Sequence, residues 1–182
     1  MANLFLEIFT AVVAVAAAYF VYRQTITFRN SERSWVLGGV EDLSIQNVLV
    51  SKANGSDVVP VICTLRNYGV KPVWITAASW GLKVVESAAN LPTEPDYGEW
   101  KRLETHVPLL PESTGRYVRH VLVISVAEFE SVLAKKRELY VYGFASYKDA
   151  FGLPRESRFC FNYVGNPPCF QPGGPKNYNR YC

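Results

Sequence analysis

The chain has 182 residues, carries 19 Lys and Arg against 16 Asp and Glu, and is 49% hydrophobic and 14% aromatic. This composition excludes a disordered chain, a collagen-like chain and a transporter with many membrane spans. A net charge of only +3 gives no electrostatic footprint for nucleic acid, so we expect no nucleic-acid partner.

The first expected element is an apolar segment over residues 4–22 whose only charge is Glu7. A helix of this length just crosses the hydrocarbon core of a bilayer, and aromatic residues at its C-terminal end match an interfacial belt. We therefore predict that residues 1–22 are a permanent single-pass anchor in the lipid bilayer. A cleavable signal peptide is the minority interpretation, because the alanines at 16–18 offer a cleavage site although no basic residue precedes the apolar stretch.

The charges that flank this segment predict its orientation. Arg23, Arg29 and Arg33 follow it closely, and no basic residue precedes it. The positive-inside bias then places the N-terminus outside and the main domain in the cytoplasm, with the anchor in the inner (cytoplasmic) membrane. A periplasmic domain is the alternative, since four cysteines would permit two disulfides in an exported domain.

One face of the anchor carries a polar and small-residue stripe. Glu7, Thr10, Ala14 and Ala18 recur at helical spacing. Small residues let another helix backbone approach closely, and an intramembrane carboxyl is a functional candidate. The stripe predicts contact with a partner helix of a membrane protein, whereas the alternative is that Glu7 lies near the interface and reaches water.

After a polar juxtamembrane linker, residues 23–34, the pattern changes to short apolar runs separated by Gly, Pro and Asn. Such runs are typical of an antiparallel β-sandwich, which we expect over residues 35–164 with an immunoglobulin-like arrangement. The loop at 86–99 is rich in Pro and acidic residues. The expected strands are 35–40, 43–51, 58–66, 73–85, 100–107, 117–124, 139–148 and 155–164.

One short helix is expected between the strands at 117–124 and 139–148. Ser125 and Glu128 fit a capping box, in which each side chain satisfies a free backbone donor at the helix start. Phe129 and Val132 then fall on one helix face, and basic residues at 135–137 suit the last turn. We expect this helix to pack on the sandwich rather than to carry function.

Two structural turns are expected in the domain. Asn67 and Gly69 end a strand, because both residue types tolerate a positive φ. Asp149 and Gly152 form the turn of a hairpin, in which Asp bonds its own backbone and Gly takes the left-handed position. Aromatic residues alternate on both hairpin strands, so we expect one aromatic face that packs in the core; a ligand platform is the alternative.

The C-terminal tail, residues 165–182, is dense in Pro and Gly. That density predicts no regular structure there. Its aromatic residues nevertheless suggest that it lies along the domain surface.

Several motifs together resemble a group of uncharacterised bacterial single-pass membrane proteins with a β-sandwich domain. The similar segments are a Trp-Val pair after an arginine at 33–36, Asn-Tyr-Gly-Val-Lys-Pro at 67–72, Tyr-Lys-Asp-Ala-Phe-Gly at 147–152 and Phe-Cys at 159–160. A further match lies near Gly174-Pro175 and Tyr178-Asn179. The resemblance implies an N-terminal span and a β-sandwich over nearly the whole chain, and it implies no activity.

The sequence offers little raw material for catalysis. It has no phosphate-binding loop, dinucleotide fingerprint, zinc-protease motif or nucleophile elbow. The cysteines lack a Cys-x-x-Cys pair, so we expect neither a metal nor another cofactor. We predict a non-catalytic, membrane-anchored accessory or scaffolding subunit of a membrane assembly. The alternative is an exported envelope domain that binds a polymer or ligand through surface aromatic residues.

Overall fold

The computed structural model describes residues 2–31, 35–41, 43, 49, 51–52, 54–97, 107–111 and 118–181 of the chain. The chain forms two compact units, Met1–Arg33 and Ser34–Cys182. The first unit is a single helix, α1 (Ala2–Ser31). Residues 23–31 of the expected juxtamembrane linker therefore continue the helix.

Within α1, Thr10–Phe28 is a 19-residue stretch that is long and apolar enough to cross a membrane, and none of it is buried against the rest of the chain. Two hydroxyls in its C-terminal part are satisfied inside the helix. Thr25 Oγ1 donates to Val21 O at 2.9 Å, and Thr27 Oγ1 donates to Arg23 O at 3.0 Å. Back-bonding of this kind removes a polar donor from an apolar environment.

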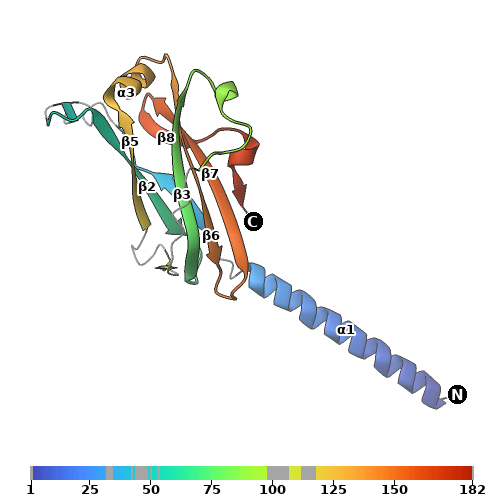
Figure 1. The fold of residues 1–182 in the computed structure, drawn as a ribbon. Coiled ribbons are helices and arrows are strands. Elements are labelled where there is room, and N and C mark those ends of the chain that lie inside the picture. Colours follow the sequence, from blue (N-terminus) through green and yellow to red (C-terminus); the bar gives the residue numbers. More distant parts are fainter. Residues whose placement is uncertain are drawn as a thin grey trace. The chain divides into compact units, whose positions relative to one another are not determined.

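The second unit is a β-sandwich of two antiparallel sheets, which confirms the expected fold class, although its immunoglobulin-like subtype stays a prediction. Teal β2 and gold β5 lie in one sheet, and green β3 with orange β6 and β7 lie in the other (Figure 1). The small sheet has the order β1 (Val36–Val40), β2 (Val58–Asn67), β5 (Val118–Ser125). The large sheet has the order β4 (Val107–Leu109), β3 (Val73–Val85), β6 (Glu138–Lys148), β7 (Pro154–Gly165), β8 (Pro168–Pro172), and β9 (Arg180–Tyr181) also pairs with β7.

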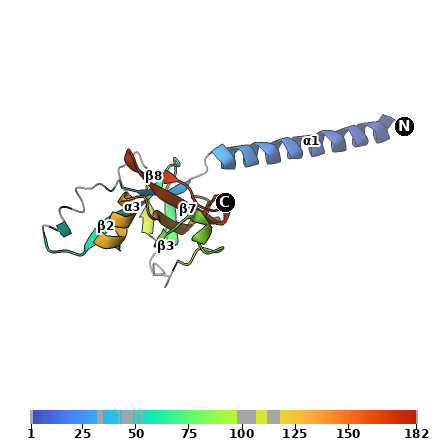
Figure 2. The ribbon, with the colours of Figure 1, turned by 90° about the horizontal axis from the view of Figure 1, so that it is seen from above.

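The short helix is α3 (Val126–Leu133), and it lies beside β2 when the sandwich is seen from above (Figure 2). Both halves of the predicted capping box are present: Ser125 Oγ accepts from Glu128 N, and the Glu128 side chain accepts from Ser125 N. Phe129 is fully buried and packs edge to face on Tyr163, with ring centroids 5.4 Å apart. The helix therefore seals one end of the sandwich, as expected.

The inner core lies between the two sheets. Alternate residues of β2 point inward and are almost fully buried. They meet the inward side chains of the large sheet, where Phe159 packs on Trp80 with ring centroids 4.5 Å apart. Gly38 of β1 leaves room for the Phe159 ring, because a Cβ at this position would lie 2.4 Å from it. The main inner-core residues are Val59, Val61, Cys63, Leu65, Ile75, Val141, Phe159 and Tyr163.

The expectation of a single aromatic face on the β6–β7 hairpin is wrong. Tyr142 is paired with Cys160, and Val141 is paired with Phe161. Directly opposed residues of antiparallel strands point to the same face. The even-numbered aromatics of β6 (Tyr140, Tyr142 and Phe144) therefore face away from the odd-numbered aromatics of β7 (Phe159, Phe161 and Tyr163).

A second hydrophobic layer covers the outer face of the large sheet. Tyr140, Tyr142 and Cys160 are buried there beneath Leu91 and Tyr178, which come from two segments outside the main strands. These segments are the β3–β4 connection, which contains η1 (Ala88–Asn90), and the tail, which contains η3 (Lys176–Tyr178). The large sheet is thus buried on both faces where these two segments cover it.

The prediction of an irregular tail is also wrong, because β8 and β9 both pair with β7. The tail does lie along the domain, and its Tyr178 is fully buried. The predicted strands at 43–51 and 100–107 fall mainly outside the described residues. At Leu49, Ser51 and Lys52 the chain is helical rather than extended.

Candidate functional site

The β3–β4 connection is attached to the tail through hydrogen bonds to its backbone. The Tyr178 hydroxyl donates to Pro92 O at 2.9 Å, and Asn177 Nδ2 donates to Thr93 O at 3.2 Å. Beneath them, the Tyr142 hydroxyl donates to Asp96 O at 2.9 Å. The carbonyls of Pro92, Thr93 and Asp96 lie outside helices and strands, so they need side-chain donors as hydrogen-bond partners. The two segments therefore hold each other in place over β6 and β7.

Besides the pairing of β8 and β9 with β7, one asparagine side chain holds the tail against β7. Asn179 Oδ1 accepts from Cys160 N at 3.0 Å, and Asn179 Nδ2 donates to Gly173 O at 2.8 Å. Gly174 has a φ of +83°, and a Cβ there would lie 2.6 Å from Cys160 Sγ. Glycine is thus required at this position for both its backbone conformation and its close approach to the thiol.

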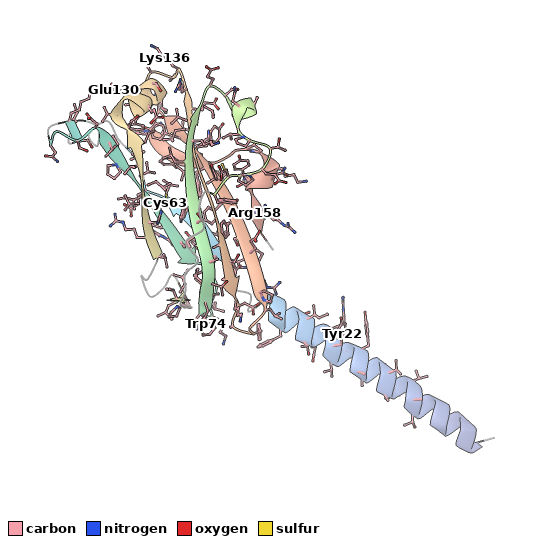
Figure 3. All side chains as sticks on the ribbon, in the orientation of Figure 1. Tyr22, Cys63, Trp74, Glu130, Lys136 and Arg158 are labelled. Carbon is pink, nitrogen blue, oxygen red and sulfur yellow. The ribbon has the colours of Figure 1, made fainter. Side chains whose placement is uncertain are left out.

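The two segments and β7 enclose an open cleft, which we call the outer cleft, with a volume of about 780 Å³. The β3–β4 connection forms one wall, β7 supplies Arg158, and the tail forms the other wall. Arg158 projects from β7 and is marked in Figure 3. The lining residues are Glu94, Pro95, Tyr97, Arg158, Lys176, Asn177, Asn179 and Arg180.

The electrostatics of the outer cleft are dominated by cations. Arg158 and Arg180 are directly opposed across the β7–β9 pair. Arg158 Nε donates to Glu156 Oε1 at 2.8 Å, and this hydrogen bond raises the pKa of the guanidinium. Within the described part of the chain, Lys176 makes no ion pair. Among the described lining residues, Glu94 is the one acid against three cations, so this part of the lining is net positive.

A second hollow of about 440 Å³ lies next to the outer cleft along β7. Arg180 lines both hollows, and the second also has Lys148, Arg155 and the acidic Glu156 in its lining. Arg155 is paired with Asp149, and Glu156 with Arg158.

The thiols are placed for packing rather than for nucleophilic chemistry. Cys63 lies in the inner core and Cys160 in the outer layer, and burial raises the pKa of each thiol to about 12. A thiol with such a pKa holds almost no thiolate at neutral pH. Cys169 is half-buried, and no group of three metal-ligating side chains occurs in the part of the chain that the structure describes.

Asp149 lies at the centre of the hairpin turn that the sequence identifies. Its Oδ1 accepts from Phe151 N and Leu153 N at 2.9 Å each, and its Oδ2 accepts from Arg155 Nε at 3.2 Å. Gly152 has a φ of +76° in open space. The carboxylate is buried and accepts three hydrogen bonds, which hold the turn together.

Asn67 acts in its turn through its side chain and not through a positive φ, which neither Asn67 nor Gly69 adopts. Its Nδ2 donates to Lys71 O at 2.7 Å and to Leu109 O at 3.1 Å, while its Oδ1 accepts from Gly69 N at 2.9 Å. The side chain thus joins β2 to the β2–β3 turn and to β4. These side-chain hydrogen bonds, rather than a positive φ, end the strand at this turn.

The predicted anchor stripe lies on α1. Thr10, Ala14 and Ala18 are exposed and four residues apart, and the Glu7 side chain lies outside the described residues. Of the two histidines, His120 is exposed on β5, and His106 is outside the described residues. The sequence reasoning missed Arg158, Lys176 and Arg180. Lys176 and Arg180 belong to a cluster of Lys, Arg and Asn in the Pro/Gly-rich tail, whereas Arg158 lies in the expected strand 155–164 and has no such signal.

No family model matches this chain, and no curated protein matches it either. Among solved structures, it is similar to the crystal structure of a Bordetella pertussis protein provisionally designated ApaA. The two are 11% identical over 70% of this chain and 91% of that chain, with a TM-score of 0.34. A similarity this distant assigns no function to this chain.

Proposed function

We propose that this chain is a membrane-anchored accessory subunit without catalytic activity, and that its outer cleft binds an acidic segment of a partner protein. The observation that carries the proposal is the directly opposed pair Arg158 and Arg180 in the cleft. A carboxylate in the cleft can accept hydrogen bonds from guanidinium groups, and the net positive charge of the described lining residues would attract it. Lys176 on the adjoining wall adds a third cation.

The membrane anchor is supported by the properties of α1. Its stretch Thr10–Phe28 is apolar, long enough to cross a bilayer, and not buried among the described residues. A bilayer would cover this apolar surface, and the threonines back-bonded within the helix leave few polar groups that need water. Because a signal sequence shares these properties, the intact mass of the membrane-bound protein is the test: the full-length mass supports an anchor, and loss of the first 18 residues or so would contradict it.

The buried aromatic residues favour this role over binding of a polymer by the hairpin. Tyr142, Phe144 and Phe159 are each at most 2% exposed. Such side chains pack the domain and offer no platform to a ligand. The absence of a catalytic role is supported by the raised pKa of both buried thiols.

The cleft is tested with two synthetic peptides, hepta-glutamate and hepta-lysine, and the full-length chain in detergent micelles. We expect fluorescence anisotropy to detect binding of hepta-glutamate only. The double variant Lys176→Glu/Arg180→Glu is expected to weaken that binding at least tenfold, because it reverses two of the cleft's charges. The matched control is Lys135→Glu/Lys136→Glu, which makes the same charge change beside α3. Equal loss in both double variants would overturn the proposal.

We further propose that the sandwich faces the cytoplasm and that Glu7, Thr10, Ala14 and Ala18 contact a partner helix. Cys169 is the half-exposed thiol that can report orientation, and an impermeant thiol reagent should modify it only in opened cells. For the helix contact, Ala14→Leu should reduce retention in the native assembly after mild detergent extraction, whereas Val12→Leu should not. Labelling of Cys169 in intact cells, or equal retention of both variants, would contradict the respective proposal.

A further inference from the structure

The exposed aromatic side chains of the sandwich gather at one of its ends. Four aromatic residues of the described part of this unit are exposed, and all four lie where β1 and β3 begin or in the β6–β7 turn. Two exposed aliphatic residues accompany them. We call the set the aromatic end: Trp35, Tyr68, Val70, Trp74, Phe151 and Leu153.

Strand pairing brings these residues together. Tyr68 N donates to Trp35 O at 2.8 Å, so the start of β1 and the β2–β3 turn adjoin. Trp74 is paired with Lys148, which is itself paired with Pro154 across the Phe151-bearing turn. Figure 3 shows Trp74 at one end of the sandwich and Glu130 and Lys136 of the α3 region at the other.

Positive charge accompanies the aromatic side chains. Lys71 lies in the β2–β3 turn and Lys148 at the end of β6, and both are exposed. Among the described residues of this region, the acidic side chain is Asp149, which is buried and paired with Arg155. Exposed Trp and Tyr beside Lys is the composition of a surface that contacts lipid headgroups, where ring and ammonium each find their preferred environment.

The short chain connection sets an upper limit on the distance between this end and the apolar stretch of α1. Six residues lie between Phe28, at the end of the apolar stretch, and Trp35, and the first three of them are helical. Helical and extended rises limit the distance between the two Cα atoms to roughly 19 Å. If the span ended at Tyr22, the limit would be roughly 28 Å. The α3 end of the sandwich is about 30 Å from the aromatic end, which is the length of the ten-residue β2.

We propose that the aromatic end rests on the anionic lipid surface of the membrane in which α1 is anchored. The inference rests on the anchor of the proposed function. It adds a second contact with the bilayer, which would restrict how the outer cleft is presented to a partner.

The test uses the full-length chain with Cys169→Ser and Cys182→Ser, so that an introduced cysteine is the reactive thiol beside the buried Cys63 and Cys160. An environment-sensitive fluorophore is attached at Phe151→Cys or, as the matched control near α3, at Val123→Cys. Val123 is also an exposed apolar residue. The chain is reconstituted in phosphatidylcholine–phosphatidylglycerol vesicles that contain lipids with a nitroxide on the headgroup.

We expect at least twofold stronger quenching at position 151 than at position 123. Charge reversal by Lys71→Glu/Lys148→Glu should remove at least half of the quenching at 151, whereas Lys135→Glu/Lys136→Glu should leave it unchanged. Equal quenching at the two positions, or no effect of the reversal at the aromatic end, would overturn the inference. Carbonate washing separates the two proposals: extraction of the chain contradicts the anchor, and a retained chain with an unquenched label contradicts this inference alone.

Discussion

The two faces of the large sheet are buried in different ways. The inner face is covered by a second sheet, in which the backbone groups form hydrogen bonds between strands and need no side-chain partners. The outer face is closed by the β3–β4 connection and the tail, whose carbonyls depend on Tyr142, Asn177, Tyr178 and Asn179. Each layer contains one buried thiol, Cys63 inside and Cys160 outside. The inner face therefore stabilises the fold, while the outer face shapes a cleft and can open locally.

The largest expected effect is on the inner face. Phe159→Ala removes a ring that packs on Trp80 and fills the space beside Gly38, and truncations of this kind cost about 3–5 kcal/mol. The free energy of unfolding in urea should fall by that amount. Phe170→Ala, which truncates a half-buried ring, should cost clearly less; equal losses would mean that the inner core is not the main source of stability.

The turn between β6 and β7 comes next. Asp149→Ala deletes an acceptor of three hydrogen bonds, including one from Arg155, and should lower the free energy of unfolding by about 2–3 kcal/mol. Gly152→Ala tests the backbone of the same turn and should cost about 1 kcal/mol, because its φ is positive and nothing lies near the added methyl. If Asp149→Ala left stability unchanged, the turn would not hold the hairpin register.

Alkaline pH should weaken both layers. The pKa of each buried thiol is raised from 9.0 to about 12 in the folded chain, so between these values the folded state keeps protons that the unfolded state releases. Stability is therefore complete below pH 9 and falls above it, by up to about 1.4 kcal/mol per pH unit for each thiol. Urea unfolding at a series of pH values should show a shallower decline for Cys160→Ala than for the natural chain. An identical decline would show that Cys160 is not protected from ionisation.

The smallest expected loss of stability should distinguish the outer layer from the inner core most clearly. Tyr178→Phe removes the hydroxyl that donates to Pro92 O and should cost about 1 kcal/mol in the outer layer. That loss corresponds to a roughly fivefold faster alkylation of Cys160 under native conditions, if the outer layer opens by itself. Cys63 should alkylate more slowly than Cys160 in both proteins. Equal acceleration of the two thiols would mean that the layers open together.

Local patterns in the sequence predicted much of the sandwich. The capping box of Ser125 and Glu128, the hairpin turn of Asp149 and Gly152, and most described strands depend on residues close in the chain. The outer cleft could not be found in this way. Its cations Arg158 and Arg180 are 22 positions apart and meet only because β9 returns to β7.

The sequence by itself determined the apolar N-terminal helix, the β-rich domain and its turns, because hydrophobic periodicity and turn chemistry act over a few residues. Only the tertiary structure decided which face of the hairpin each aromatic residue occupies. The five-residue connection from Asp149 to Leu153 pairs even-numbered residues with even-numbered ones, and so divides the aromatic residues between two layers. Alternation along one strand cannot predict this division, because the register between two strands depends on their connection and on which side chains each face can bury.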